Sequence, residues 1–167
     1  MRPSLIILVV IFLAAPVFGA MEQESVFGVW VTEGGESKLE IYSCGDKACA
    51  KVIWIKHPTY VSSKDGPVGM EKVDRQNPDP ALRSRSIQGL QVMDGLARQG
   101  EWWQNGSCYD PQTGKYYQCK MHLESLTELK LRGFIGFSPI GRSYTLTRDR
   151  SEQTRTAQNR EAKSSLP

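Results

Sequence analysis

The chain has 167 residues, of which 21 are lysine or arginine, 18 are aspartate or glutamate and 40% are hydrophobic. That length provides one domain with a core of its own, but not two, once an N-terminal leader is set aside. The net charge of +3 is distributed in both signs, which excludes the clustered basic surface of a nucleic-acid-binding or membrane-surface protein.

Residues 1–19 have the layout of a secretory signal peptide. Arg2 supplies a positive start, and an unbroken apolar run extends from Leu5 to Ala15. We expect cleavage after Gly19, because small residues then occupy the two positions that the signal peptidase reads. The run is shorter than the roughly 20 residues of a membrane-spanning helix, and no cysteine follows it as a lipid attachment site. The mature protein is therefore predicted to be periplasmic or secreted, with no transmembrane span.

Four cysteines in an exported chain are expected to form two disulfides. Turn-forming residues lie between the members of two pairs, which favours the pairings Cys44–Cys49 and Cys108–Cys119. A zinc site is the alternative, but neither spacing is the C-x2-C pattern of four-cysteine zinc sites. We therefore predict two disulfides, no metal and no cofactor.

Hydrophobic and polar residues alternate around the first cysteine pair, which predicts a β-hairpin. If the two cysteines lie directly opposite each other, Ile41 faces Val52 and Leu39 faces Trp54 on one apolar face. The disulfide then lies on the other face and clips the hairpin from outside. The positions expected to point inward are Leu39, Ile41, Val52, Trp54, Tyr117 and Leu129.

A long loop follows at residues 57–73, and the stretch "VDRQNPDPALRSR" at residues 73–85 comes after it. One helical turn is expected behind Pro80, capped by Asn77 or Asp79. Further alternating strands surround the second cysteine pair and continue to Arg148. The single domain is predicted to span residues 26–149, and residues 150–167 lack large apolar side chains and are predicted to be disordered.

Short strands joined by hairpins predict an all-β fold, an antiparallel barrel of about eight strands with one short helical turn. Gly28 and Trp30 form a G-x-W at the first strand, and Arg148 ends the last one. This pattern resembles the lipocalin and wider calycin families, in which the tryptophan packs beneath the arginine at the closed base of the barrel. An arginine stacked on an indole plugs that base through a cation–π contact.

Four longer stretches carry a resemblance to one bacterial family. They are "GVWVTEGGESKLEIYSCGDKACAKVIWI", "DRQNPDPALRSRSIQGLQVM", "WQNGSCYDPQTGKYYQCKMHL" and "LRGFIGFSPIGRSYTLTRD". In this order they resemble the family known as domain of unknown function 2147. The resemblance implies a small, exported, lipocalin-like barrel, and it implies no established activity.

The charged stretch at residues 73–85 has several interpretations. Its carboxylate and amide oxygens suit calcium, but the glycine and terminal glutamate of the known loop type are absent and three arginines would repel a cation. An acid/base site using Asp74 or Asp79 with Arg83 is a second interpretation. The favoured one is an ion-paired structural corner. Its residues would be Asp74, Asn77 and Asp79.

Ligand contacts are expected from arginines at the barrel mouth and from aromatic side chains. Arg83 and Arg85 could present paired donors to an anionic group. The adjacent Trp102 and Trp103 must point to opposite faces of a strand, so one of them lies outside the core. The candidate ligand-binding residues are Arg83, Arg85, Trp102, Trp103 and Tyr117.

These features predict an exported barrel that binds a small apolar or amphipathic molecule, for example a lipid-like one. The alternative is a structural or interaction protein of the cell envelope, with a filled barrel and a protein partner. No nucleophile elbow, phosphate-binding loop or dinucleotide fingerprint is present in the sequence. We therefore predict no enzymatic activity and no nucleic-acid partner.

Overall fold

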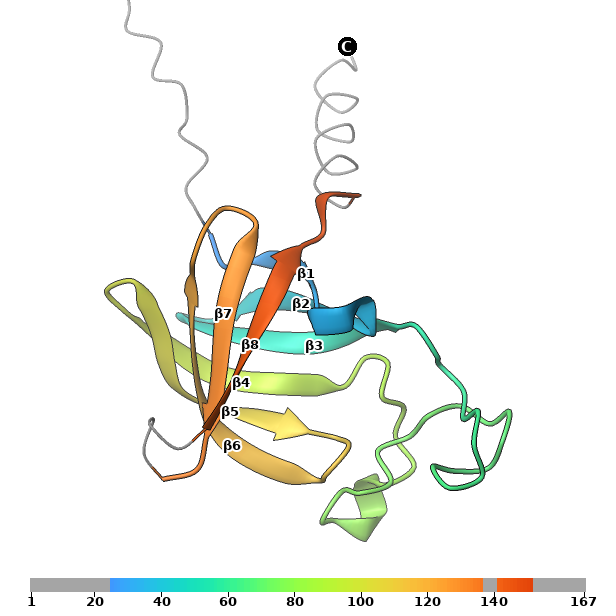
Figure 1. Ribbon diagram of the computed structural model, residues 1–167. Helices are drawn as coiled ribbons and strands as arrows, with labels where there is room; N and C mark the ends of the chain where they lie inside the picture. Colours follow the sequence, from blue (N-terminus) through green and yellow to red (C-terminus); the bar gives the residue numbers. More distant parts are fainter. Residues whose placement is uncertain (1–24, 137–140, 152–167) are drawn as a thin grey trace, which may run out of the picture.

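Eight antiparallel strands form a closed barrel in which each strand pairs with its neighbours in sequence (Figure 1). The computed structural model describes residues 25–136 and 141–151, so the expected signal peptide and nearly all of the expected tail lie outside it. The elements are β1 (Gly28–Val31), η1 (Glu33–Gly35), β2 (Ser37–Cys44), β3 (Lys47–Ile55), η2 (Pro80–Leu82), β4 (Gln91–Gln99), β5 (Trp102–Asp110), β6 (Lys115–Leu123), β7 (Glu128–Phe134) and β8 (Gly141–Arg148).

The expected lipocalin-like barrel is confirmed. β1 closes it by pairing with β8, where Trp30 lies opposite Arg148 and Val31 opposite Thr147. The helical turn expected behind Pro80 is the 3-10 turn η2, whereas η1 is a second short turn that the sequence pattern does not predict. In the described part of the chain, no helix has the length and apolar character needed to cross a membrane.

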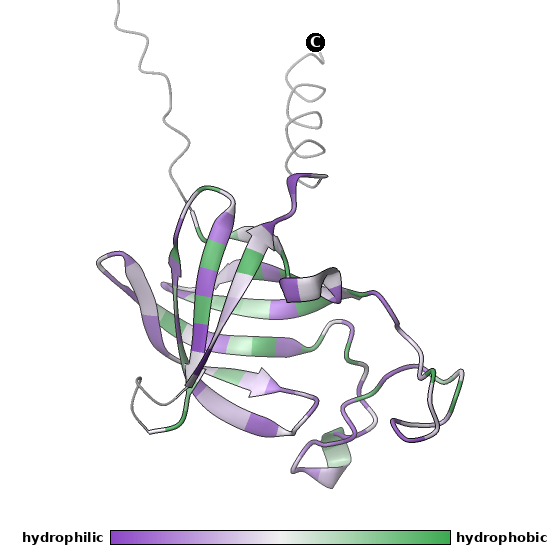
Figure 2. Ribbon diagram, viewed as in Figure 1, coloured by the Kyte–Doolittle hydropathy of each residue, from purple (hydrophilic) through white to green (hydrophobic). Residues whose placement is uncertain are grey.

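Apolar side chains from every strand meet in one core. Hydrophobic and hydrophilic residues alternate along β7, as expected for a strand with one buried face (Figure 2). Trp103 packs on this core and meets Phe27 edge to face, with 5.4 Å between the ring centroids. The largest apolar side chains that are fully buried are Trp30, Ile41, Leu96, Met121, Leu129 and Leu146.

The register predicted for the first hairpin is wrong by two residues. Ile41 pairs with Ala50 and Leu39 with Val52, because the chain turns through two residues immediately after Cys44. Leu39, Ile41 and Val52 still face inward, since a shift of two residues keeps each side chain on its face. A β-bulge then turns Trp54 outward, where 40% of it is exposed.

Both predicted disulfides are present, and each joins residues that are diagonal rather than directly opposite. Cys44 pairs across the hairpin with Lys47, and its Cα lies 5.9 Å from that of Cys49. Cys108 and Cys119 have a Cα–Cα distance of 5.8 Å. Disulfides therefore clip the β2–β3 and β5–β6 hairpins at a spacing that suits the bond.

The base of the barrel is closed by Trp30 and Arg148. The Arg148 guanidinium carbon lies 4.1 Å from the centroid of the Trp30 ring, which is fully buried. The same guanidinium donates hydrogen bonds to the carbonyl oxygens of Leu126, Phe27 and Ser25. A Cβ at Gly28 would lie 3.3 Å from Arg148 Nη1 and would need a φ of +122°, so glycine suits this position.

Replacing this arginine tests its contribution to stability. We expect Arg148→Met to lower the free energy of unfolding by about 2–4 kcal/mol, because three carbonyl groups lose a charged donor and the indole loses its cation. Urea denaturation with the disulfides intact measures the change. Arg98→Met is the matched control, since this exposed arginine hydrogen-bonds, among the described residues, only to the nearby carbonyl oxygen of Gly100. A loss below about 1 kcal/mol for Arg148→Met would contradict the assignment.

Candidate functional site

The long connection between β3 and β4 folds back beside the β5–β6 hairpin (Figure 1). Its local structure is built by side chains that accept backbone hydrogen bonds. Asp79 caps η2 by accepting from the Ala81 amide at 2.9 Å, and Asn77 Oδ1 accepts from the Asp79 amide at 2.9 Å. The cap expected from the sequence is therefore Asp79, and Asn77 shapes the turn before it.

A buried carboxylate holds this loop against the barrel. Asp74 is completely buried, and its Oδ1 accepts a hydrogen bond of 2.6 Å from the hydroxyl of Tyr109 on β5. Its Oδ2 accepts from Asn77 Nδ2 at 2.7 Å and from Arg85 Nε at 2.9 Å. Asn77 Nδ2 also donates to the Tyr109 hydroxyl at 3.1 Å. The favoured interpretation of residues 73–85 as an ion-paired corner agrees with this geometry.

Close backbone contact at the β5–β6 turn supports the same docking. A Cβ at Gly114 would lie 1.8 Å from the carbonyl oxygen of Gln76, and the residue has a φ of +68°. Only glycine accommodates both the backbone conformation and the approach of the loop. The turn of β5–β6 and residues 73–85 therefore pack directly against each other.

The network also perturbs the proton affinities of its members. Burial, followed by the hydrogen bond to the Asp74 carboxylate, raises the pKa of Tyr109 to about 12. Burial alone would lower the pKa of Arg85, but its hydrogen bond with Asp74 and the attraction of that carboxylate raise it instead. Arg85 is thus a fixed cation, and Tyr109 is a neutral donor at physiological pH.

A hollow of about 290 Å³ opens beside this corner. It lies on the outer face of the barrel. Asp94 pairs with Ser107, and Tyr109 pairs with Tyr116. Each of these pairs is next to a pair that faces inward, so its side chains point outward. Arg85 contributes one wall, where 36% of its side chain remains exposed. The residues that line the hollow include Arg85, Gln91, Asp94, Ser107, Tyr109 and Tyr116.

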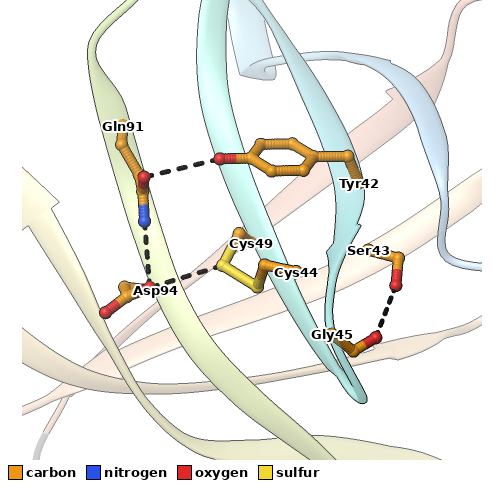
Figure 3. Close-up of a disulfide and its surroundings, with 7 residues drawn as sticks. All are labelled: Tyr42, Ser43, Cys44, Gly45, Cys49, Gln91 and Asp94. Atoms are coloured by element: carbon orange, nitrogen blue, oxygen red, sulfur yellow. Dashed lines mark hydrogen bonds between the residues drawn. A yellow bond between two sulfur atoms is a disulfide. The ribbon is translucent and has the colours of Figure 1, made fainter.

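Side chains of the first hairpin, β2–β3, contact the residues that form the wall of this hollow. Gln91 Nε2 donates to Asp94 Oδ1 at 2.9 Å, and the Tyr42 hydroxyl donates to Gln91 Oε1 at 3.4 Å (Figure 3). Asp94 Oδ1 also lies 3.3 Å from Cys49 Sγ. Cys44, Cys49 and Asp94 come as close together as metal ligands would, but the sulfurs are bonded to each other and are not thiolates.

A second hollow, of about 280 Å³, adjoins the first along β5 and β6. It is centred on a β-bulge between Trp103 and Gly106, where Asn105 has a φ of 63°. Asparagine tolerates this left-handed conformation better than most residues. The lining residues are Gln104, Asn105, Gly106, Gln118, Cys119 and Phe134.

The five predicted ligand residues are not brought together. Arg85 lines the first hollow, whereas Arg83 is exposed and donates from Nε to the carbonyl oxygen of Asn77 at 2.7 Å. Trp103 packs on the core, and Trp102 lies outside, 4.0 Å from the ring centroid of His122. Tyr117 pairs with the inward-facing Cys108, so it points into the barrel as expected. It is not among the residues that line either hollow.

Sequence reasoning missed most residues of the first hollow. Alternation from the inward-facing Tyr117 and Cys108 would have placed Tyr116, Tyr109 and Ser107 on the outward face. No local signal marks Gln91 and Asp94, because their position depends on bulges in the pairing of β3 with β4. The hollow is therefore a product of tertiary structure.

The pH dependence of stability tests the Asp74–Tyr109 bond. Because the pKa of Tyr109 rises from 10.0 to about 12 on folding, its contribution is present below pH 10 and is lost between pH 10 and 12. We expect wild type to lose about 2 kcal/mol more than Tyr109→Phe across this interval. Urea denaturation at each pH measures the difference, with the exposed Tyr144→Phe as control. Parallel losses in wild type and Tyr109→Phe would contradict the bond.

Comparison with solved structures identifies a similar fold in Protein HP1028 from the human pathogen Helicobacter pylori, described as belonging to the lipocalin family. The TM-score is 0.64 and the identity 22%, over 79% of this chain and 88% of that chain, a likeness that shows the fold alone. Curated proteins provide no match. A family model described as "Uncharacterized protein conserved in bacteria (DUF2147)" matches residues 28–148. The chain belongs to the DUF2147 family.

Proposed function

We propose that this domain is an exported binding protein that holds a small amphipathic ligand in the hollow beside Arg85. The observation that carries the proposal is the composition of that hollow. A fixed guanidinium lies at one side, Tyr116, which is 57% exposed, presents an aromatic ring, and the nearly buried Val92 and Met93 lie at the bottom of the hollow. Polar side chains form most of the lining, so the hollow suits a ligand with polar groups for them and some apolar surface for the ring of Tyr116.

Arg85 is well placed to select an acidic group on the ligand. Its Nε and Nη2 both bind Asp74 Oδ2, at 2.9 and 2.8 Å. Within the residues that the structure describes, Nη1 forms no hydrogen bond, so one edge of the guanidinium remains for a ligand oxygen. Because Asp74 already orients the side chain, little conformational entropy is lost when the ligand binds.

The interior of the barrel favours an external site. Side chains from all eight strands pack there as one buried cluster, which leaves the flank rather than the centre as the place for a ligand. This filling also supports the alternative function, an interaction protein of the cell envelope with no small ligand. The hollow favours the binding protein, since a purely structural barrel has no need of an exposed aromatic ring beside an oriented cation.

The proposal includes export and the absence of catalysis. Two disulfides in a protein of a bacterial family suggest a compartment outside the cytoplasm. Asp74, the residue considered as an acid or base, is fully buried and already bonded to Arg85 and Tyr109. A carboxylate in that position stabilises the corner and is not available to a substrate.

Native mass spectrometry of the protein isolated from its own envelope tests the site. We expect a bound small molecule in wild type, and at least about a tenfold lower occupancy in Arg85→Lys, because lysine can still pair with Asp74 but lacks the second donor edge. Tyr116→Ala should lower occupancy as well.

Arg83→Lys is the matched control, since Arg83 makes a similar loop contact outside the hollow. The occupancy of this variant should equal that of wild type. A bare mass for the wild-type protein, or equal losses in the two arginine variants, would overturn the proposal and favour the interaction protein.

A further inference from the structure

We infer that the ligand is an acidic oligosaccharide, and that it extends from the hollow beside Arg85 into the second hollow along the outer face of β5 and β6. This inference rests on the proposed function and specifies its ligand class. It starts from the position of the two hollows, each of which has a volume close to 300 Å³.

The hollows meet at a pair of directly opposed residues. Ser107 on β5 lines the first hollow, and its cross-strand partner Gln118 on β6 lines the second. Tyr116 lies two residues from Gln118 along β6, about 7 Å away. Phe134 on β7 is the cross-strand partner of Gln118, about 5 Å away on the other side. A path with an aromatic ring at each end therefore crosses one flank of the barrel.

The side chains along this path match a hydroxyl-rich ligand. Gln91, Ser107, Gln118 and Asn105 carry amide or hydroxyl groups, which both donate and accept hydrogen bonds as sugar hydroxyls do. The aromatic rings offer apolar faces to the C–H surfaces of sugar rings. Asp94 accepts from hydroxyl groups, whereas a carboxylate on the ligand is placed at the opposite wall by Arg85.

Two other extended ligands fit this path less well. A peptide usually adds a strand at an exposed sheet edge, but β4, β5, β6 and β7 are each paired on both sides and the path runs over their face. A lipid chain needs continuous apolar walls, and amides and a hydroxyl interrupt this path between Tyr116 and Phe134.

Calorimetric titration with galacturonate, digalacturonate and trigalacturonate tests the inference. We expect trigalacturonate to bind about tenfold more tightly than galacturonate, because the longer chain gains a second aromatic contact. Galactotriose, which lacks carboxylates, should bind about tenfold more weakly than trigalacturonate.

Two variants separate the hollows. Phe134→Ala should remove the gain with chain length and leave galacturonate affinity unchanged, while Tyr116→Ala should weaken both ligands. Gln118→Ala, at an exposed strand position, repeats the test of the second hollow without removing a ring. Trp54→Ala is the control, since this ring is 40% exposed and lies near Lys38 on another part of the barrel. Thermal unfolding verifies that each variant is folded.

The outcomes distinguish this inference from the proposed function. If galacturonate binds in a Tyr116-dependent way but affinity does not grow with chain length, the extended site is wrong and the single-hollow binding protein stands. If no saccharide binds while wild type retains an envelope molecule that Arg85→Lys loses, the ligand class is wrong. If the envelope molecule that wild type retains is a peptide or a lipid, that class of molecule is the ligand in place of an acidic oligosaccharide.

Discussion

The buried carboxylate of Asp74 is the interaction on which the candidate site depends. An unpaired carboxylate in such a position would be strongly unfavourable, so Tyr109, Asn77 and Arg85 must all reach it for the loop to fold in this form. The hydroxyl of Tyr109 comes from β5, whereas the other two partners come from the loop. One group thus ties the loop to the sheet and fixes the orientation of the arginine beside the hollow.

The barrel supplies the rigid surface that this corner needs. Its interior is packed with apolar side chains, and its base is closed by Arg148 stacked on Trp30. Lipocalin-like architecture is generally suited to holding ligands inside, whereas the hollow beside Arg85 lies on the outer face of β4–β6. The long β3–β4 connection packs at the edge of that face, and its Arg85 forms one wall of the hollow.

Local patterns were sufficient for the fold but not for every register. The two disulfide pairs and the barrel follow from spacing and alternation, which act within a few residues or reflect the need to cover sheet edges. The G-x-W closure was expected from the resemblance to lipocalins. The position of Trp54 was wrong because a β-bulge shifts one residue without leaving a distinct sequence signal. The same kind of irregularity positions Gln91 and Asp94, and it also lay beyond sequence reasoning.

By itself, the sequence determined an antiparallel β-barrel with two clipped hairpins, because these features arise from the period and spacing of residues close together in the chain. The plugged base was expected from the resemblance to lipocalins, and the ion-paired corner was the favoured one of several interpretations of residues 73–85. Tertiary structure decided which arginine lines the hollow: Asp74 orients Arg85 beside it, whereas Arg83 binds the Asn77 carbonyl oxygen outside it. It also decided that Trp102 and Tyr116 differ in role, although both alternate outward. Trp102 and Tyr116 differ because a long loop docks against only one face of the barrel. That docking depends on contacts between residues more than 30 positions apart, such as Asp74 and Tyr109.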